Sequence, residues 1–136
     1  MEFEYQNSDV WATLVRLATS VGRLKVVSNL RAAADAQQRA FEEAGRACGL
    51  FAETSLRDGA AQITGLRETR AAVTRCRAWL QVLASVTNEP ETAFSEELGL
   101  TEHAARQLAA MIRLAERGAP RPNARSANRG TRGGRA

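Results

Sequence analysis

Arginine is the residue type whose spacing in this chain points most directly to chemistry. Within residues 63–86, Arg70 and Arg77 are seven positions apart, and Arg67 and Arg75 lie close to them in sequence. Positions seven apart share one flank of a helix, so this segment predicts a helix with a strongly cationic flank. Guanidinium groups suit phosphate, and the flank therefore predicts contact with a polyanion.

A second group of arginines occupies residues 118–136, spaced by Gly, Asn, Ser and Thr: Arg121, Arg125, Arg129, Arg132 and Arg135. This segment has no large apolar residue to offset the entropy of ordering, so we predict a tail that is disordered in isolation. Each tail arginine that contacts a phosphate should steepen the salt dependence of binding by roughly one unit. The alternative is a tail that only increases solubility.

The charge of the chain is unevenly distributed. It has 19 Lys and Arg against 15 Asp and Glu, but five of the basic residues follow Gly118, which leaves 14 basic and 15 acidic residues before it. Any affinity for nucleic acid should therefore come from the tail and from local patches, and not from a uniformly basic surface.

Other residues that could do chemistry are few. The single histidine, His103, is expected at the surface, and Cys48 and Cys76 fall at apolar positions where we expect buried, reduced thiols. The pairs Glu42-Glu43 and Glu96-Glu97 are adjacent, so their carboxylates point in different directions on a helix. We predict no catalytic residue, no metal and no cofactor, and hence a protein that is not an enzyme.

Composition predicts an all-α fold. Hydrophobic residues make up 44% of the chain and aromatic residues 5%, with many alanines, which is typical of closely packed helices. We predict an up-down four-helix bundle at residues 1–117, with a short extra helix, followed by the tail at 118–136. The sequence shows neither an apolar run of membrane-spanning length nor a signal peptide, so we expect a cytoplasmic protein.

Apolar spacing locates the helices. The first is capped by Ser8 and Asp9, ends between Ser20 and Asn29, and has an apolar row at Val10, Leu14, Leu17, Val21 and Leu24. The second has two rows, one of Val27, Ala34, Phe41 and Cys48, and one of Leu30, Gln37, Ala44 and Phe51. Gln37 is a polar exception that needs hydrogen-bond partners.

The third helix should follow a turn at Asp58-Gly59 and end before Pro90. Its core rows are Leu66, Val73 and Leu80, and Thr69, Cys76 and Leu83. Pro90 is expected to open a short helix ending at Gly99, and Thr101 to cap the last helix, which Gly118 ends. The apolar face of that helix consists of Ala104, Ala105, Leu108, Met111, Ile112 and Ala115.

The second and third helices resemble the bacterial four-helix-bundle family first found in intervening sequences of large-subunit ribosomal RNA genes. Residues of the second helix that match its pattern are Leu30-Arg31, Ala33-Ala34, Phe41 and Glu43. Those of the third are Leu66-Arg67, Arg70, Ala71-Ala72, Val73 and Leu80. The segment 77–83 and the basic tail are more similar to the branch of accessory variability proteins of diversity-generating retroelements.

This resemblance implies a non-enzymatic bundle that assembles into a ring, often a pentamer, and binds nucleic acid with a basic surface. It also implies that the ring is the partner of a reverse transcriptase and helps that enzyme to use its template RNA.

Two other interpretations stay open. Residues 91–117 have the spacing of a helix-turn-helix, with the turn at Leu98 to Leu100 and with Glu102, His103 and Arg106 toward a DNA groove. Alternatively, the chain is a structural adaptor without a nucleic-acid role, in which Trp11, Trp79 and Phe94 contact other subunits.

Overall fold

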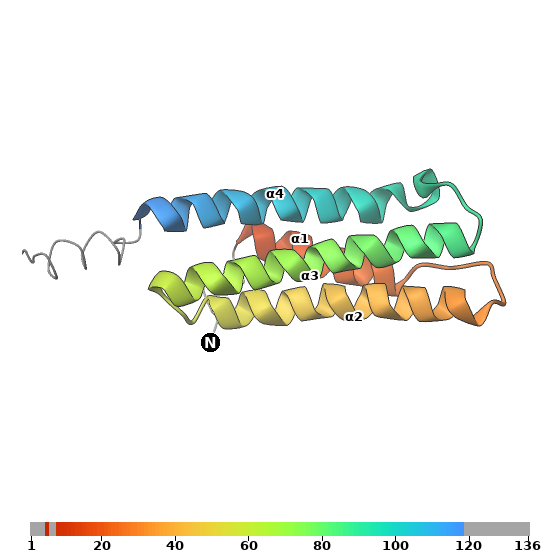
Figure 1. Ribbon diagram of the computed structural model, residues 1–136, viewed down its shortest axis with the longest axis horizontal. Coiled ribbons are helices and arrows are strands. Elements are labelled where there is room, and N and C mark those ends of the chain that lie inside the picture. Colours follow the sequence, from red (N-terminus) through yellow and green to blue (C-terminus); the bar gives the residue numbers. More distant parts are fainter. Residues whose placement is uncertain (1–4, 6–7, 119–136) are drawn as a thin grey trace, which may run out of the picture.

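The computed structural model describes Tyr5 and residues 8–118, and these residues form a bundle of four long helices (Figure 1). The helices are α1 (Asp9–Gly22), α2 (Arg31–Thr54), α3 (Gly59–Val86) and α4 (Ser95–Gly118), with a short 3₁₀ helix, η2 (Glu91–Phe94), before α4. Their main contacts run in the cyclic order α1, α2, α3, α4 and back to α1. The predicted all-α bundle is confirmed, and it has four faces, each formed by one pair of neighbouring helices.

Helix α1 forms as its sequence predicts. The Ser8 Oγ accepts a hydrogen bond from the Trp11 backbone N–H (3.1 Å) and so caps the helix. The side chains of the predicted apolar row are buried up to Val21, and the helix ends at Gly22, inside the expected window. A Cβ at Gly22 would lie 2.9 Å from Cε1 of Phe41, so this glycine lets the ring of α2 approach α1.

Helix α3 also confirms its predicted core. All six residues of its two rows are buried: Leu66, Thr69, Val73, Cys76, Leu80 and Leu83. The helix begins at Gly59, whose φ of +61° suits the expected turn. A Cβ at Gly65 would overlap the Thr54 side chain, so glycine is what allows the start of α3 to lie against the end of α2.

The prediction for α2 was wrong in part. Val27 lies before the helix and is 100% exposed, and Ala34 and Phe41 are exposed as well. The buried row is instead Ala33, Ala36, Ala40, Ala44, Ala47 and Phe51. Alanine on this row lets α2 pack closely on α3, which turns the neighbouring row toward the outside. The expectation for Gln37 is confirmed, because its Nε2 donates to the carbonyl oxygens of Val21 (3.1 Å) and Leu24 (2.9 Å).

The predicted boundary in the last segment was also wrong. Helix α4 begins at Ser95 and continues through Gly99 and Thr101, whose hydroxyl donates to the Leu98 carbonyl oxygen (2.6 Å). One glycine costs a helix about 1 kcal/mol, and burial of Leu100 and Thr101 on the same turn outweighs that cost. Residues 98–100 are therefore helical, and the helix-turn-helix interpretation lacks its turn.

The apolar face predicted for this helix is confirmed, since Ala104, Leu108 and Ile112 are buried. Within the range 8–118, no helix is long and apolar enough to cross a membrane. The predicted tail, with Arg121, Arg125, Arg129, Arg132 and Arg135, lies outside the described residues apart from Gly118, where α4 ends.

Candidate nucleic-acid interface

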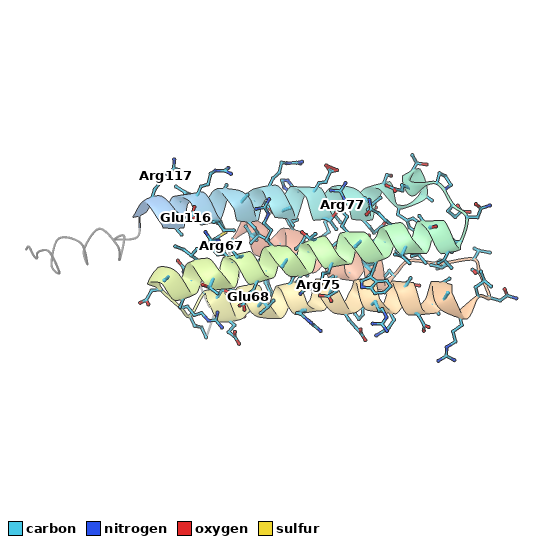
Figure 2. The ribbon with its side chains drawn as sticks, viewed as in Figure 1. Arg67, Glu68, Arg75, Arg77, Glu116 and Arg117 are labelled. Atoms are coloured by element: carbon cyan, nitrogen blue, oxygen red, sulfur yellow. The ribbon has the colours of Figure 1, made fainter. Side chains whose placement is uncertain are left out.

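The four arginines predicted on α3 divide between two sides of the helix (Figure 2). Arg67 and Arg77 lie on the side toward α4, whereas Arg75 lies toward α2. Arg70 is seven residues from Arg77 and therefore shares its flank. The structure thus separates a set that sequence spacing had placed together.

On the α2 side, the cations have partners. The Arg75 Nε donates to Oε1 of Glu43 (3.0 Å), and the Nε of Arg46 lies 3.9 Å from the same oxygen. The guanidinium carbon of Arg39 lies 5.1 Å from the centroid of the Trp79 ring, within the range of a cation–π contact. This side of α3 therefore presents arginines whose charge is already compensated or engaged.

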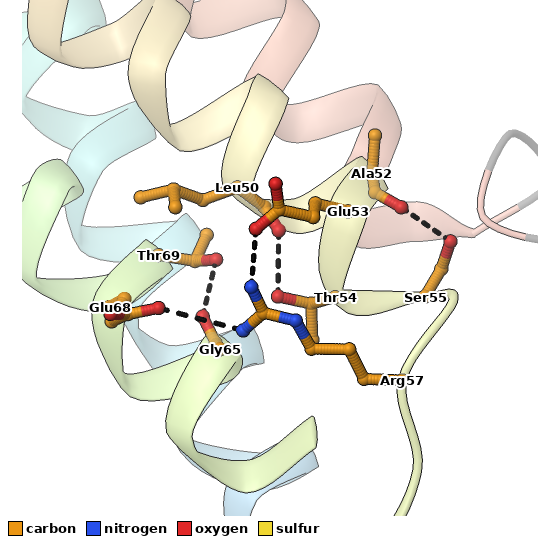
Figure 3. A network of polar contacts seen from close by, with 9 residues as sticks. All are labelled: Leu50, Ala52, Glu53, Thr54, Ser55, Arg57, Gly65, Glu68 and Thr69. Carbon is orange, nitrogen blue, oxygen red and sulfur yellow. Dashed lines mark hydrogen bonds and ion pairs between the residues drawn. The ribbon is translucent and has the colours of Figure 1, made fainter. Parts of the chain in front are cut away.

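The same side holds a polar network where α2 ends and α3 begins (Figure 3). Arg57 pairs with Glu53 of α2 and lies 3.7 Å from Oε1 of Glu68 of α3. In both helices a threonine donates to the carbonyl four residues earlier, Thr54 to Leu50 (2.6 Å) and Thr69 to Gly65 (2.8 Å). The Arg57 contacts join the two helices across their loop, which is a structural role.

On the α4 side, an ion pair between Arg67 and Glu116 fixes the register of two antiparallel helices. Three residues further along α3, and three back along α4, Arg70 lies opposite Arg113. By the same register, Arg77 lies opposite Arg106. These cations of the two helices therefore lie at matching levels along the bundle.

We call this surface the basic face and define it by its exposed arginines: Arg67, Arg70, Arg77, Arg106 and Arg113. Arg106 lies 3.9 Å from Glu102 on its own helix, and Arg67 pairs with Glu116. Among residues 8–118, no carboxylate pairs with Arg70, Arg77 or Arg113. The face thus keeps an excess of positive charge in a body that is nearly neutral.

Sequence reasoning missed the part of the basic face that lies on α4. It considered Arg106 only as a DNA-groove residue of the helix-turn-helix, and it did not single out Arg113. The available signal was their spacing, because Arg106 and Arg113 are seven apart, as are Arg70 and Arg77. The spacing could not show that the two pairs lie at matching levels of neighbouring helices, since that depends on which helix packs beside α3.

The expectation of a buried thiol is confirmed for Cys76, whereas Cys48 is only half-buried. Cys76 is buried, and both it and Cys48 are free. Burial raises the pKa of the Cys76 thiol to about 12, and the nearby Glu43 carboxylate contributes to the increase. Burial also raises the pKa of Cys48. Both side chains therefore stay protonated at neutral pH, which does not suit a nucleophile.

Charges of both signs gather at one other place, an open cavity of about 450 Å³ between the end of α1 and the start of α4. Arg16, Arg23 and Lys25 line it together with Glu96 and Glu97. Glu97 is buried and accepts a hydrogen bond from the Ser20 hydroxyl, which ties α4 to α1. His103 is exposed, as expected, and in the described part of the chain no cluster of His, Cys, Asp and Glu could hold a metal ion.

Comparison with known protein families, with curated proteins and with solved structures finds no match to this chain.

Proposed function

We propose that this chain is a non-enzymatic nucleic-acid-binding protein whose basic face contacts phosphates. One observation carries the proposal: Arg70, Arg77 and Arg113 are exposed, cluster on one face, and have no carboxylate partner among the described residues. Exposed guanidinium groups in such a cluster gain free energy by displacing the counterions of a polyanion.

The dimensions of the face favour a strand of linked phosphates over a single anion. Packed helices lie about 8–10 Å apart, so the arginines form two rows at about that separation. Within a row, Arg70 and Arg77 are separated along the helix by about 10 Å. A backbone with repeated charges can contact several of these groups at once, whereas one small anion reaches only one or two.

The tail extends the proposal. Its arginines follow Gly118, at the end of α4 that carries Glu116 and meets the start of α3. Tail and face together thus supply phosphate contacts beginning at the same end of the bundle.

The resemblance described above supports more specific proposals. It supports RNA as the ligand, a reverse transcriptase as the protein partner, and a ring of copies, often five, as the assembly; we propose a cytoplasmic location from the sequence alone. We propose these together as the role of an accessory protein that helps the polymerase use its template.

Two matched variants test the nucleic-acid proposal. In Arg70→Gln/Arg77→Gln the basic face loses two charges, and in Arg39→Gln/Arg75→Gln the α2 side loses the same number. Binding of a fluorescently labelled single-stranded RNA is followed by anisotropy over a range of salt concentrations. Because each lost phosphate contact flattens the slope of log K against log salt by about 0.7, we expect a decrease of about 1.4 for the first variant.

The second variant loses the same charge, but Arg75 is paired with Glu43 and Arg39 lies against Trp79, so its slope should stay close to that of the unaltered protein. Equal slopes for the two variants would contradict the assignment to the basic face. A slope unchanged in both would contradict phosphate contacts by the folded body. Circular dichroism of each variant controls for loss of structure.

A further inference from the structure

The face formed by α1 and α2 lies on the opposite side of the bundle from the basic face, because the helices contact each other in cyclic order (Figure 1). This face is defined by residues of both helices: Trp11, Val15 and Gly22 of α1, and Phe41, Gly45 and Cys48 of α2. The other residues that helical spacing places on this face are alanine or glutamine. None of these positions is charged, although charged residues make up 25% of the chain, so this face differs from its neighbours.

Large apolar side chains on this face are left open to water. Val15 is 39% exposed, and Phe41 is 42% exposed even though one edge of its ring lies against Gly22. Single exposed apolar residues are normal on a protein surface, but here they lie on one uncharged strip across two helices. Such a strip gains free energy when another protein surface covers it.

The glycines of α2 point to the same conclusion. A Cβ at Gly45 or at Gly49 would have no atom within 4 Å, so packing inside the chain does not require glycine at either position. Glycine in a helix interior is less favourable than any residue except proline. Gly45 is exposed on the same strip, one turn after Phe41, so it leaves the backbone of α2 open to close approach by a partner.

The strip is of a size that a stable interface needs. Helix α1 has 14 residues and α2 has 24, which correspond to lengths of about 21 and 36 Å. Two adjacent helices are about 20 Å wide, so the strip covers roughly 400–700 Å² before side-chain relief is counted. This approaches the ~800 Å² that each partner buries in a standard interface.

We infer that a second copy of this chain packs on the α1–α2 face and covers Val15, Phe41 and the exposed Gly45. Another copy brings a surface that is equally free of charge, so neither partner has to bury an unpaired ion. Packing on this side also leaves the basic face exposed to its ligand. The inference rests on the self-assembly in the proposed function and names the surface that makes it.

Two glycine substitutions test it. Gly45→Glu places a charge in the proposed interface, and Gly99→Glu places the same charge in open space near the start of α4. Glutamate forms helix better than glycine, so both variants should fold. The masses of nuclease-treated proteins at high salt are measured by light scattering, with a chain of 14.7 kDa as the unit.

We expect the unaltered protein and Gly99→Glu to share one mass, about 29 kDa for two copies or about 73 kDa for a ring of five. We expect Gly45→Glu to fall to the mass of a single chain. A monomeric unaltered protein would overturn the inference, and so would an assembly that keeps its mass in Gly45→Glu.

The test separates this inference from nucleic-acid binding. Arg70→Gln/Arg77→Gln alters the opposite side of the bundle, so it should keep the mass of the unaltered assembly while losing salt-dependent binding. Intact assembly without any RNA binding would contradict the nucleic-acid proposal and still support the α1–α2 interface.

Discussion

Helix α3 carries arginines on two sides, and the two sides differ in what the neighbouring helix offers. Toward α2, Arg75 meets Glu43, a carboxylate whose side chain is only 14% exposed and which Arg46 also approaches. Toward α4, Arg77 lies in register with Arg106, which is another cation. The same residue type in one helix is thus part of the structure on one side and available to a ligand on the other.

The positions of the acidic residues decide which arginines form ion pairs and which do not. On α4, Glu116 pairs with Arg67 and Glu102 lies near Arg106, so both acids of the basic face are already engaged. Exposed ion pairs contribute little to stability, typically below about 1 kcal/mol. Their larger effect here is to select which guanidinium groups remain free for phosphate.

The largest expected effect comes from removing the tail arginines, which isolates the contribution of the folded body. With all five replaced by glutamine, the slope of log K against log salt for single-stranded RNA should decrease by about 3.5, because each contact contributes about 0.7. Anisotropy titrations measure it. In this background, the Arg70→Gln/Arg77→Gln and Arg39→Gln/Arg75→Gln variants should still differ in their salt slopes. If replacing the tail arginines leaves the slope unchanged, the tail does not contact phosphates.

The next effect concerns stability on the α2 side. Gly65→Ala forces a methyl group into the Thr54 side chain, so we expect it to lower the free energy of unfolding by about 1–3 kcal/mol. Gly99→Ala is the matched control, because it lies in open space and should raise that free energy by about 0.5–1 kcal/mol. Urea unfolding followed by circular dichroism compares them. Equal effects would mean that close packing is not what requires Gly65.

A smaller change should make the two sides of α3 alike. Glu43→Gln removes the acid shared by Arg75 and Arg46, so the α2 side should gain free guanidinium groups. We expect the salt slope of RNA binding to steepen by about 0.7 for each arginine that gains a phosphate contact. Glu42→Gln removes the same charge next to it without freeing Arg75 and serves as the control. If both variants bind alike, local pairing does not select the ligand-binding arginines.

The last effect is a change of stability with pH, to which Glu43 also contributes. Burial first, and this carboxylate second, raise the pKa of Cys76 from 9.0 to about 12. The folded protein therefore holds this proton more tightly than the unfolded chain does. The resulting stability is fully present below pH 9 and is lost as the pH rises toward 12. Unfolding free energies of the unaltered protein and Cys76→Ala, measured across this range, should converge at high pH; parallel curves would contradict the raised pKa.

Much of the fold follows from local patterns in the chain. The rows of α1 and α3 repeat at helical spacing, and Ser8, Gly59 and Pro90 mark helix ends by backbone chemistry that acts over a few residues. The start of α1 and both ends of α3 were therefore predictable, whereas the end of α1 was predicted only to lie between Ser20 and Asn29. The failures, in α2 and at the start of α4, occurred where a helix offered two apolar rows or where one glycine interrupted a pattern.

The sequence by itself determined that the chain is helical, that Arg70 and Arg77 share a flank, and that five further arginines follow Gly118. Helical periodicity is a property of a single helix, so it can be recognised in the sequence without knowing which helices pack beside it. Only the tertiary structure decided that alanines and not Phe41 face the core of α2, that Arg75 meets Glu43, and that Arg106 and Arg113 complete the basic face. These outcomes depend on which helices pack together and in what register, and that choice is made by the summed packing of the whole bundle.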